Sequence, residues 1–152
     1  MGAVTYPDEK VIKFVDYNFV PVQIETSNTA LVDQFKVKWT PAIFVLDADG
    51  NEVHQVVGFL PPEEFIPTFM VAKGKWYFNA DQHPEAQGMF DEALRGYPGS
   101  AAAAEAVFFL GVSRYKMTHN PKPLREAYET LTAKFPGSEW AKRAAPYRLI
   151  PA

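Results

Sequence analysis

An acidic cluster beginning at Asp47 is the part of this chain that comes closest to a metal-binding pattern. Asp47, Asp49 and Asn51 alternate along the chain, as oxygen ligands do at the start of a calcium loop. Such a loop also needs glycine at its sixth position and glutamate at its twelfth, where this chain has Glu52 and Gly58. The pattern therefore predicts a hairpin turn and no metal site.

Histidine and cysteine give no catalytic or zinc-binding pattern. His54, His83 and His119 are far apart and lack His-x-x-x-His spacing, so we predict surface histidines. The 152 residues contain no cysteine, which excludes disulfides, zinc thiolates and thiol nucleophiles within them. No phosphate-cradling glycine loop and no Gly-x-Ser-x-Gly elbow occurs. We expect neither a cofactor nor a bound metal.

The composition is that of a globular protein of one ordinary domain or two small ones. Aromatic residues reach 14%, so large side chains must dominate the core. The formal charge of -3 argues against nucleic acid or an anionic membrane as a partner. No apolar run approaches the roughly 20 residues needed to span a bilayer. We expect a cytoplasmic protein, or a periplasmic one if a signal peptide precedes residue 1.

The first 73 residues show both helical and strand patterns. Pro21 cannot donate a ladder hydrogen bond, which predicts an edge strand at 19–24. The apolar run at 42–47 predicts a strand buried on both faces. In the strand that returns from the hairpin, Val53 and Val57 are predicted to alternate against polar neighbours. The predicted helices are 7–17, 28–36 and 61–72, and the predicted strands are 19–24, 42–47 and 52–59.

From residue 74 onward the sequence reads as helical and contains an internal repeat. Tyr97-Pro-Gly-Ser100 and Phe135-Pro-Gly-Ser138 are near-copies, and the same offset relates Phe90 to Tyr128. We predict helix-turn-helix units in which each turn's serine caps the next helix. Aromatic residues here could line a peptide groove or fill the space between helices. They are Trp76, Tyr77, Phe78, Phe90, Phe108, Phe109, Tyr115 and Tyr128.

Thr40-Pro41 stands directly before the apolar strand, and an Asp-Gly turn and Gly58 follow it. In this order, residues 16–72 resemble the C-terminal part of a thioredoxin-like domain. The resemblance implies a partial α/β domain of about three strands. It also implies a cis Thr40–Pro41 bond and a peptide groove at Trp39, Thr40 and Pro41. Trp39 could line that groove, or it could be a core side chain that covers the helix at 28–36.

The Cys-x-x-Cys pair of the resembled family, and the strand before it, have no counterpart in this sequence. We expect a chain without redox activity of its own, whose longer parent would be a thiol-disulfide oxidoreductase. The alternative is a redox-dead peptide-binding adaptor or an oligomerisation module. In the complete family sheet, the missing strand lies between those matching 19–24 and 42–47. These two would have to pair directly or accept a strand from another chain, which makes a strand-exchanged homodimer possible.

The helical region resembles tetratricopeptide units, especially those with a Tyr-Pro-x-Ser turn between helices. The resemblance implies stacked helical hairpins that recruit a protein or peptide partner. The expected organisation is therefore a thioredoxin-like unit at 1–73, lacking its first strand and redox motif, followed by tetratricopeptide-like repeats at 74–152.

Overall fold

The computed structural model describes residues 1–151, which form two compact units. The first unit is Met1–Phe65 and the second begins at Ile66. The division falls inside helix α3, Pro62–Asn79, and the predicted boundary after residue 73 lies in the same helix. Each unit has its own hydrogen bonds and its own buried side chains.

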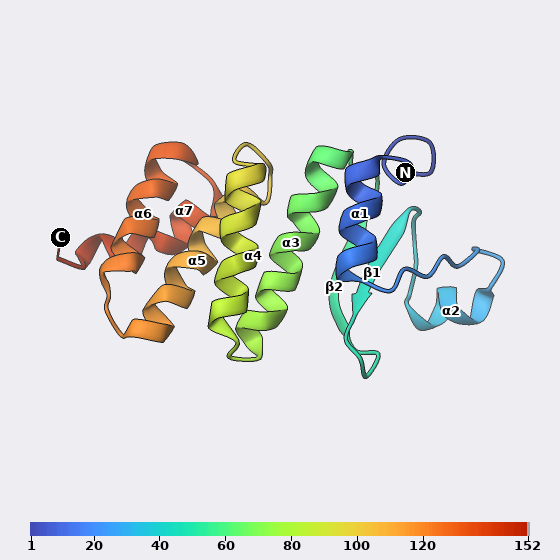
Figure 1. Ribbon diagram of the computed structural model, residues 1–152, viewed down its shortest axis with the longest axis horizontal. Helices are drawn as coiled ribbons and strands as arrows, with labels where there is room; N and C mark the ends of the chain where they lie inside the picture. Colours follow the sequence, from blue (N-terminus) through green and yellow to red (C-terminus); the bar gives the residue numbers. More distant parts are fainter. Residues whose placement is uncertain (152) are drawn as a thin grey trace. The chain divides into compact units, whose positions relative to one another are not determined.

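The first unit begins with helix α1, Glu9–Asn18 (Figure 1). Asp8 caps it, because its carboxylate accepts a hydrogen bond from the amide of Val11 at 3.1 Å. Pro7 therefore lies before the cap, whereas the sequence predicted it inside the first turn. Val11 and Phe14 are the buried residues of the helix, three positions apart on one face.

A two-stranded antiparallel sheet is the only sheet within residues 1–151. Strand β1 covers Ala42–Leu46 and strand β2 covers Glu52–Val57. The register pairs Val45 with His54 but Leu46 with Glu52, so Val53 has no opposite residue and forms a bulge. The prediction of a β1 strand buried on both faces is wrong, because its residues are half-buried or exposed.

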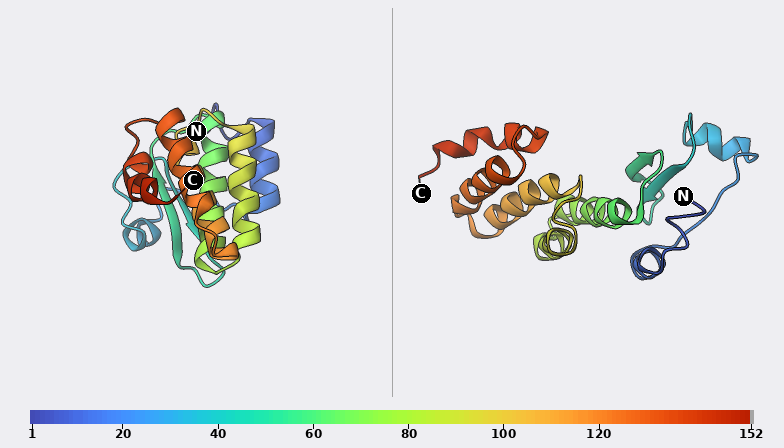
Figure 2. Two further views of the ribbon diagram at one scale, coloured as in Figure 1. Left: turned by 90° about the vertical axis from the view of Figure 1, so that its left-hand side faces the viewer. Right: turned by 90° about the horizontal axis from the view of Figure 1, so that it is seen from above.

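Residues 19–24 do not form a strand, so the prediction of about three strands is wrong. The segment leaves α1 and runs extended toward the next helix (Figure 2). Within the described chain, no backbone hydrogen bond joins residues 20–24 to another segment. The alternating valines have the sequence of a strand, but no ladder partner lies beside them, and a strand forms only by pairing.

Helix α2, Thr29–Gln34, is short and has a side-chain cap at its N-terminus. The side chain of Asn28 accepts a hydrogen bond from the amide of Leu31 at 3.2 Å, so Asn28 is the N-cap. The helix ends two residues before its predicted end. Phe35 follows it and packs on Phe44 of β1, with ring centroids 5.0 Å apart, which attaches the helix to the sheet.

The second unit is helical throughout. Its helices follow each other along the chain, and successive ones pack against each other, α4 on α5 and α5 on α6 (Figure 1). This sequential packing is what short loops between helices dictate. The elements that follow α3 are α4, His83–Gly96; α5, Ala103–Thr118; α6, Lys122–Lys134; α7, Glu139–Ala144; and a final 3-10 turn η1, Ala145–Leu149.

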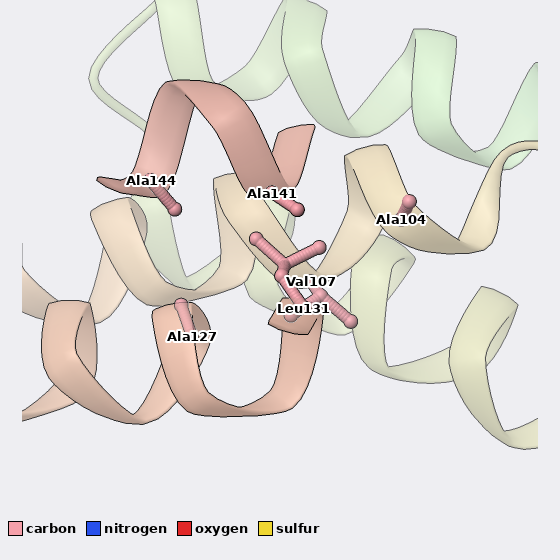
Figure 3. Close-up of a cluster of buried hydrophobic side chains, with 6 residues drawn as sticks. All are labelled: Ala104, Val107, Ala127, Leu131, Ala141 and Ala144. Carbon is pink, nitrogen blue, oxygen red and sulfur yellow. The ribbon is translucent and has the colours of Figure 1, made fainter. Parts of the chain in front are cut away.

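Small side chains allow these helices to approach closely. One core cluster joins α5, α6 and α7, with Leu131 wholly buried at its centre (Figure 3). Aromatic rings are packed around the small residues, as the sequence predicted. The cluster consists of Ala104, Val107, Ala127, Leu131, Ala141 and Ala144.

The two Pro-Gly-Ser turns follow their preceding helices in the same way but lead into the next helix differently. Tyr97 and Phe135 each end a helix, donating to the carbonyl four residues earlier at 2.8 and 2.9 Å. Ser138 then caps α7 by accepting from the amide of Ala141 at 3.1 Å, as predicted. Ser100 does not cap α5, because the chain makes a further turn and the helix starts only at Ala103. The prediction of a serine cap is therefore confirmed in one turn and wrong in the other.

Candidate functional site

Trp39, Thr40 and Pro41 lie in the connection from α2 to β1 and are accessible to solvent. The side chain of Trp39 is 71% exposed, which rules out the alternative of a core tryptophan. Thr40 is also exposed and Pro41 is half-buried. An exposed indole of this kind contributes nothing to the core and is available to a partner. The role of these three residues as a peptide groove stays a prediction.

The backbone at Thr40–Pro41 is held in place by β2. The Thr40–Pro41 peptide bond is cis, as predicted. The carbonyl oxygen of Pro41 accepts a hydrogen bond from the amide of Gly58 at 2.8 Å, which extends the ladder one residue beyond Val57. Gly58 has a φ of +100°, a backbone conformation that side chains other than glycine's rarely adopt. The glycine expected at the end of the strand is therefore required by this turn.

Two apolar side chains that the sequence did not assign to the site flank the same end of the hairpin. Val57 is 52% exposed and Phe59 is 54% exposed. The last residues that the ladder pairs are Ala42 and Val57, and the bond from Gly58 to Pro41 follows, so Trp39 and Phe59 leave the hairpin at the same end. Together with Trp39 they leave three large apolar side chains open to solvent at one end of one hairpin.

The bulge at Val53 explains why Val57 was assigned to the wrong face. The sequence predicted that Val53 and Val57 share one face of β2. After the bulge, His54 and Val56 are half-buried while Gln55 and Val57 are exposed, since one extra residue reverses the alternation. A bulge leaves no clear mark in a strand of alternating residues, so the outward position of Val57 could not be read from the sequence.

The acidic cluster forms a hairpin turn, as predicted. One carboxylate oxygen of Asp47 accepts from the amides of Asp49 and Asn51 at 3.0 and 2.8 Å, and the other accepts from the Asn51 side chain at 3.0 Å. These hydrogen bonds, the one from the Asn51 side chain first, lower the pKa of Asp47. Gly50 has a φ of +84° in this turn. Within residues 1–151, no group of three or more acidic or histidine side chains is placed to hold a metal ion.

The three histidines are not brought together. His119 is exposed at the end of α5, as predicted, and His54 is half-buried on β2. His83 is only 9% exposed, so its prediction as a surface residue is wrong. Its ring packs on Phe78 with centroids 5.3 Å apart, and its Nε2 lies 3.6 Å from a carboxylate oxygen of Asp81. His83 is thus part of the packing at the α3–α4 junction.

Part of the predicted aromatic set forms a connected cluster with two further rings of the second unit. Its members are Phe78, Phe90, Phe108, Phe109, Trp140 and Tyr147. Phe109 lies at its centre, 5.4 Å from Phe78 and 5.5 Å from Trp140 between ring centroids. Phe90 is wholly buried, whereas Phe108 and Trp140 are half-buried. Packing between helices therefore accounts for much of this set, and the half-buried rings keep one edge accessible.

The comparison with known families identifies the first part of the chain. Residues 2–73, just under half of the chain, match the model of a family described as a thioredoxin-like domain. Residues 2–73 are therefore similar to a thioredoxin-like domain, and a helical region follows them. The chain has no significant match among curated proteins or among solved structures. The kinship of the helical region with tetratricopeptide units stays a prediction.

None of the helices in the described residues is long and apolar enough to cross a membrane. The compartment stays a prediction.

Proposed function

We propose that this chain binds extended polypeptide segments at Trp39, Thr40 and Pro41 of its thioredoxin-like domain, without thiol chemistry of its own. The observation that carries the proposal is the 71% exposure of Trp39 beside a strand end fixed by the bond from Gly58 to Pro41. Thiol-disulfide exchange needs a thiolate to attack a disulfide, and none of the 152 residues can supply one. Binding is the function that these residues can still perform.

The side chains around this position suit an apolar, extended ligand. Trp39, Val57 and Phe59 are each more than half exposed. A monomer gains nothing from keeping large apolar side chains in water, and tryptophan is enriched among the residues that dominate binding energies. The first unit carries four lysines and ten acidic residues, a net charge of -6, so ligands without excess negative charge are favoured.

The test is binding of an unfolded protein to the chain and to two tryptophan variants. Reduced and alkylated lactalbumin serves as the probe, and calorimetry measures the affinity. Trp39→Ala should weaken binding at least tenfold, which corresponds to a loss of about 1.4 kcal/mol. Trp76→Ala is the matched control, since Trp76 is 39% exposed in the second unit, and it should leave the affinity unchanged. Equal affinities for Trp39→Ala and the unmodified chain would contradict the proposal.

A second candidate is that these residues form part of a thiol-disulfide oxidoreductase whose Cys-x-x-Cys pair lies in a preceding segment. The match of residues 2–73 to a thioredoxin-like domain supports it. The genomic DNA before residue 1 tests it directly, because the candidate requires an in-frame Cys-x-x-Cys codon pair there. An extended protein should then reduce insulin, whereas the 152-residue chain should not. An in-frame stop codon directly before residue 1 would contradict this candidate.

We also infer that the helical region contributes a tetratricopeptide-like surface for a protein partner. Three half-buried rings that lie together support this inference. The ring centroid of Phe108 is 5.2 Å from that of Trp140 and 6.0 Å from that of Tyr147. The guanidinium of Arg143 lies over Trp140 at 4.8 Å. In a pull-down with partner proteins from the source cell, Trp140→Ala should lose partners that Leu149→Ala retains. Identical sets of captured proteins would contradict the inference.

A further inference from the structure

We propose that residues 20–24 of one copy of this chain pair with the open edge of β1 in a second copy, in a reciprocal exchange that forms a two-fold dimer. The acceptor begins at Ala42, directly after the proposed peptide-binding residues 39–41, and the inference does not depend on peptide binding. Each copy would supply one donor segment and accept one, so the assembly closes at two.

The acceptor is the side of β1 that faces away from β2. The bond from Gly58 to Pro41 shows that residues 41 and 58 are a hydrogen-bonded pair, so Ile43 and Val45 also direct their backbone groups toward β2. The amides and carbonyls of Ala42 and Phe44 must then point the other way. Within the described residues no strand lies on that side. An open edge of this kind is a template for another strand.

The donor is the extended segment that follows α1. Val20 is 90% exposed, Val22 is 77% exposed and Ile24 is 46% exposed. These three residues alternate with Pro21 and Gln23, as in a strand with one apolar face. In the described chain, residues 20–24 make no backbone hydrogen bond to any other segment. The segment therefore has the residues of a strand, an extended backbone and no ladder.

Donor and acceptor fit each other in length and in hydrogen-bonding pattern. Both are five residues long, residues 20–24 on one side and β1 on the other. Pro21 has no amide hydrogen, so it must belong to the set of residues that faces solvent. Val20, Val22 and Ile24 then turn their amides toward the edge of β1. An isolated two-stranded hairpin is only marginally stable, and a third strand would remedy this.

The pairing of the same two segments within one copy is the alternative, and it would leave a monomer. In the structure both belong to the same unit and are nevertheless not paired. We favour the second copy, because each copy carries both a five-residue donor and an open five-residue acceptor. Because each first unit carries a net charge of -6, dimerisation should strengthen as salt is added, the opposite of an interface held by opposite charges.

The experiment is sedimentation equilibrium of the 152-residue chain from micromolar to millimolar concentration, with two proline variants. Val22→Pro removes an amide that faces the edge of β1 and should weaken dimerisation at least tenfold. Gln23→Pro introduces the same residue one position later, removes an amide that faces solvent, and should leave dimerisation unchanged. Circular dichroism checks that both variants remain folded.

A mass that stays monomeric for the unmodified chain at millimolar concentration would overturn the proposal. Equal weakening by the two prolines would also overturn it. A cysteine scan gives an independent measurement, because the chain has no cysteine of its own. Val22→Cys mixed with Phe44→Cys should give a disulfide-linked mixed dimer on oxidation, whereas Val22→Cys mixed with Leu149→Cys should not. These outcomes do not involve Trp39, so they leave the test of the peptide-binding function unaffected.

Discussion

A side-chain carbon placed on Gly74 of α3 would lie 2.5 Å from Cε1 of Phe90 on α4. Real Cβ atoms essentially never approach a neighbour so closely. Phe90 is wholly buried, so its ring has no free space into which it could move. Gly74 is therefore the residue that allows α3 and α4 to pack against each other. The helix continues through Gly74 to Asn79, although the sequence predicted that it ends near residue 72.

We predict that Gly74→Ala destabilises the second unit by about 1–3 kcal/mol, because the added methyl group overpacks the contact with Phe90. Urea denaturation followed by circular dichroism measures the loss. Gly88→Ala is the matched control, since Gly88 lies in α4, is exposed, and has nothing within 4 Å of its Cβ position. That variant should be more stable by about 0.5–1 kcal/mol through helix propensity alone. Stabilisation of similar size by both variants would contradict the close approach.

Leu131 anchors the core cluster of the last helices, and its truncation should be costly. The side chain is wholly buried among small residues such as Ala127 and Ala144, which cannot expand to fill a cavity. We predict that Leu131→Ala lowers the free energy of unfolding by about 2–5 kcal/mol. Leu149→Ala, at a residue that is 79% exposed, should change it by less than about 0.5 kcal/mol. A loss below 1 kcal/mol at Leu131 would show that the cluster collapses around the cavity.

Local chemistry made much of this fold predictable. The Asp47 turn, the Ser138 cap and the helical second unit follow from turn residues, caps and apolar spacing within a few positions. Element ends were less predictable, because they depend on distant contacts. The sequence predicted a helix end near residue 72, whereas α3 continues past Gly74, where the absence of a side chain leaves room for the ring of Phe90.

The candidate site was predictable only in part, for a similar reason. Thr40-Pro41 and Gly58 were identified from their order along the chain, and a hydrogen bond from Gly58 to Pro41 joins them in the structure. Phe59 and Val57 were missed, because a bulge at one residue reverses which side of β2 faces solvent. No strand forms at the predicted position 19–24. The alternating residues suit a strand, but a strand also needs a neighbouring strand to pair with, and the local sequence does not reveal whether one is present.

The two Pro-Gly-Ser turns allow a matched test of helix capping. Ser138 accepts a hydrogen bond from the amide of Ala141, so Ser138→Ala should cost about 0.5–2 kcal/mol. Ser100 occupies the corresponding position, yet within the described residues its buried hydroxyl has no hydrogen-bond partner. Ser100→Ala should therefore be neutral or slightly stabilising. Thermal unfolding of the two variants measures the difference, and equal losses would mean that both serines cap.

Asp47 makes the hairpin sensitive to acid. Its pKa is lowered in the folded chain, mainly by the hydrogen bond from the Asn51 side chain and then by backbone amides. The stabilisation should therefore be complete above the unfolded pKa of about 3.9 and be lost as the pH falls through the lower folded value. Nuclear magnetic resonance titration of the Asn51 amide should show a midpoint below 3.9. Asn51→Ala removes the largest cause, so in that variant the Asp47 carboxyl resonance should titrate at a higher pH, closer to its ordinary value. A midpoint at or above 3.9 in the unmodified chain would show that the turn does not stabilise the ionised carboxylate.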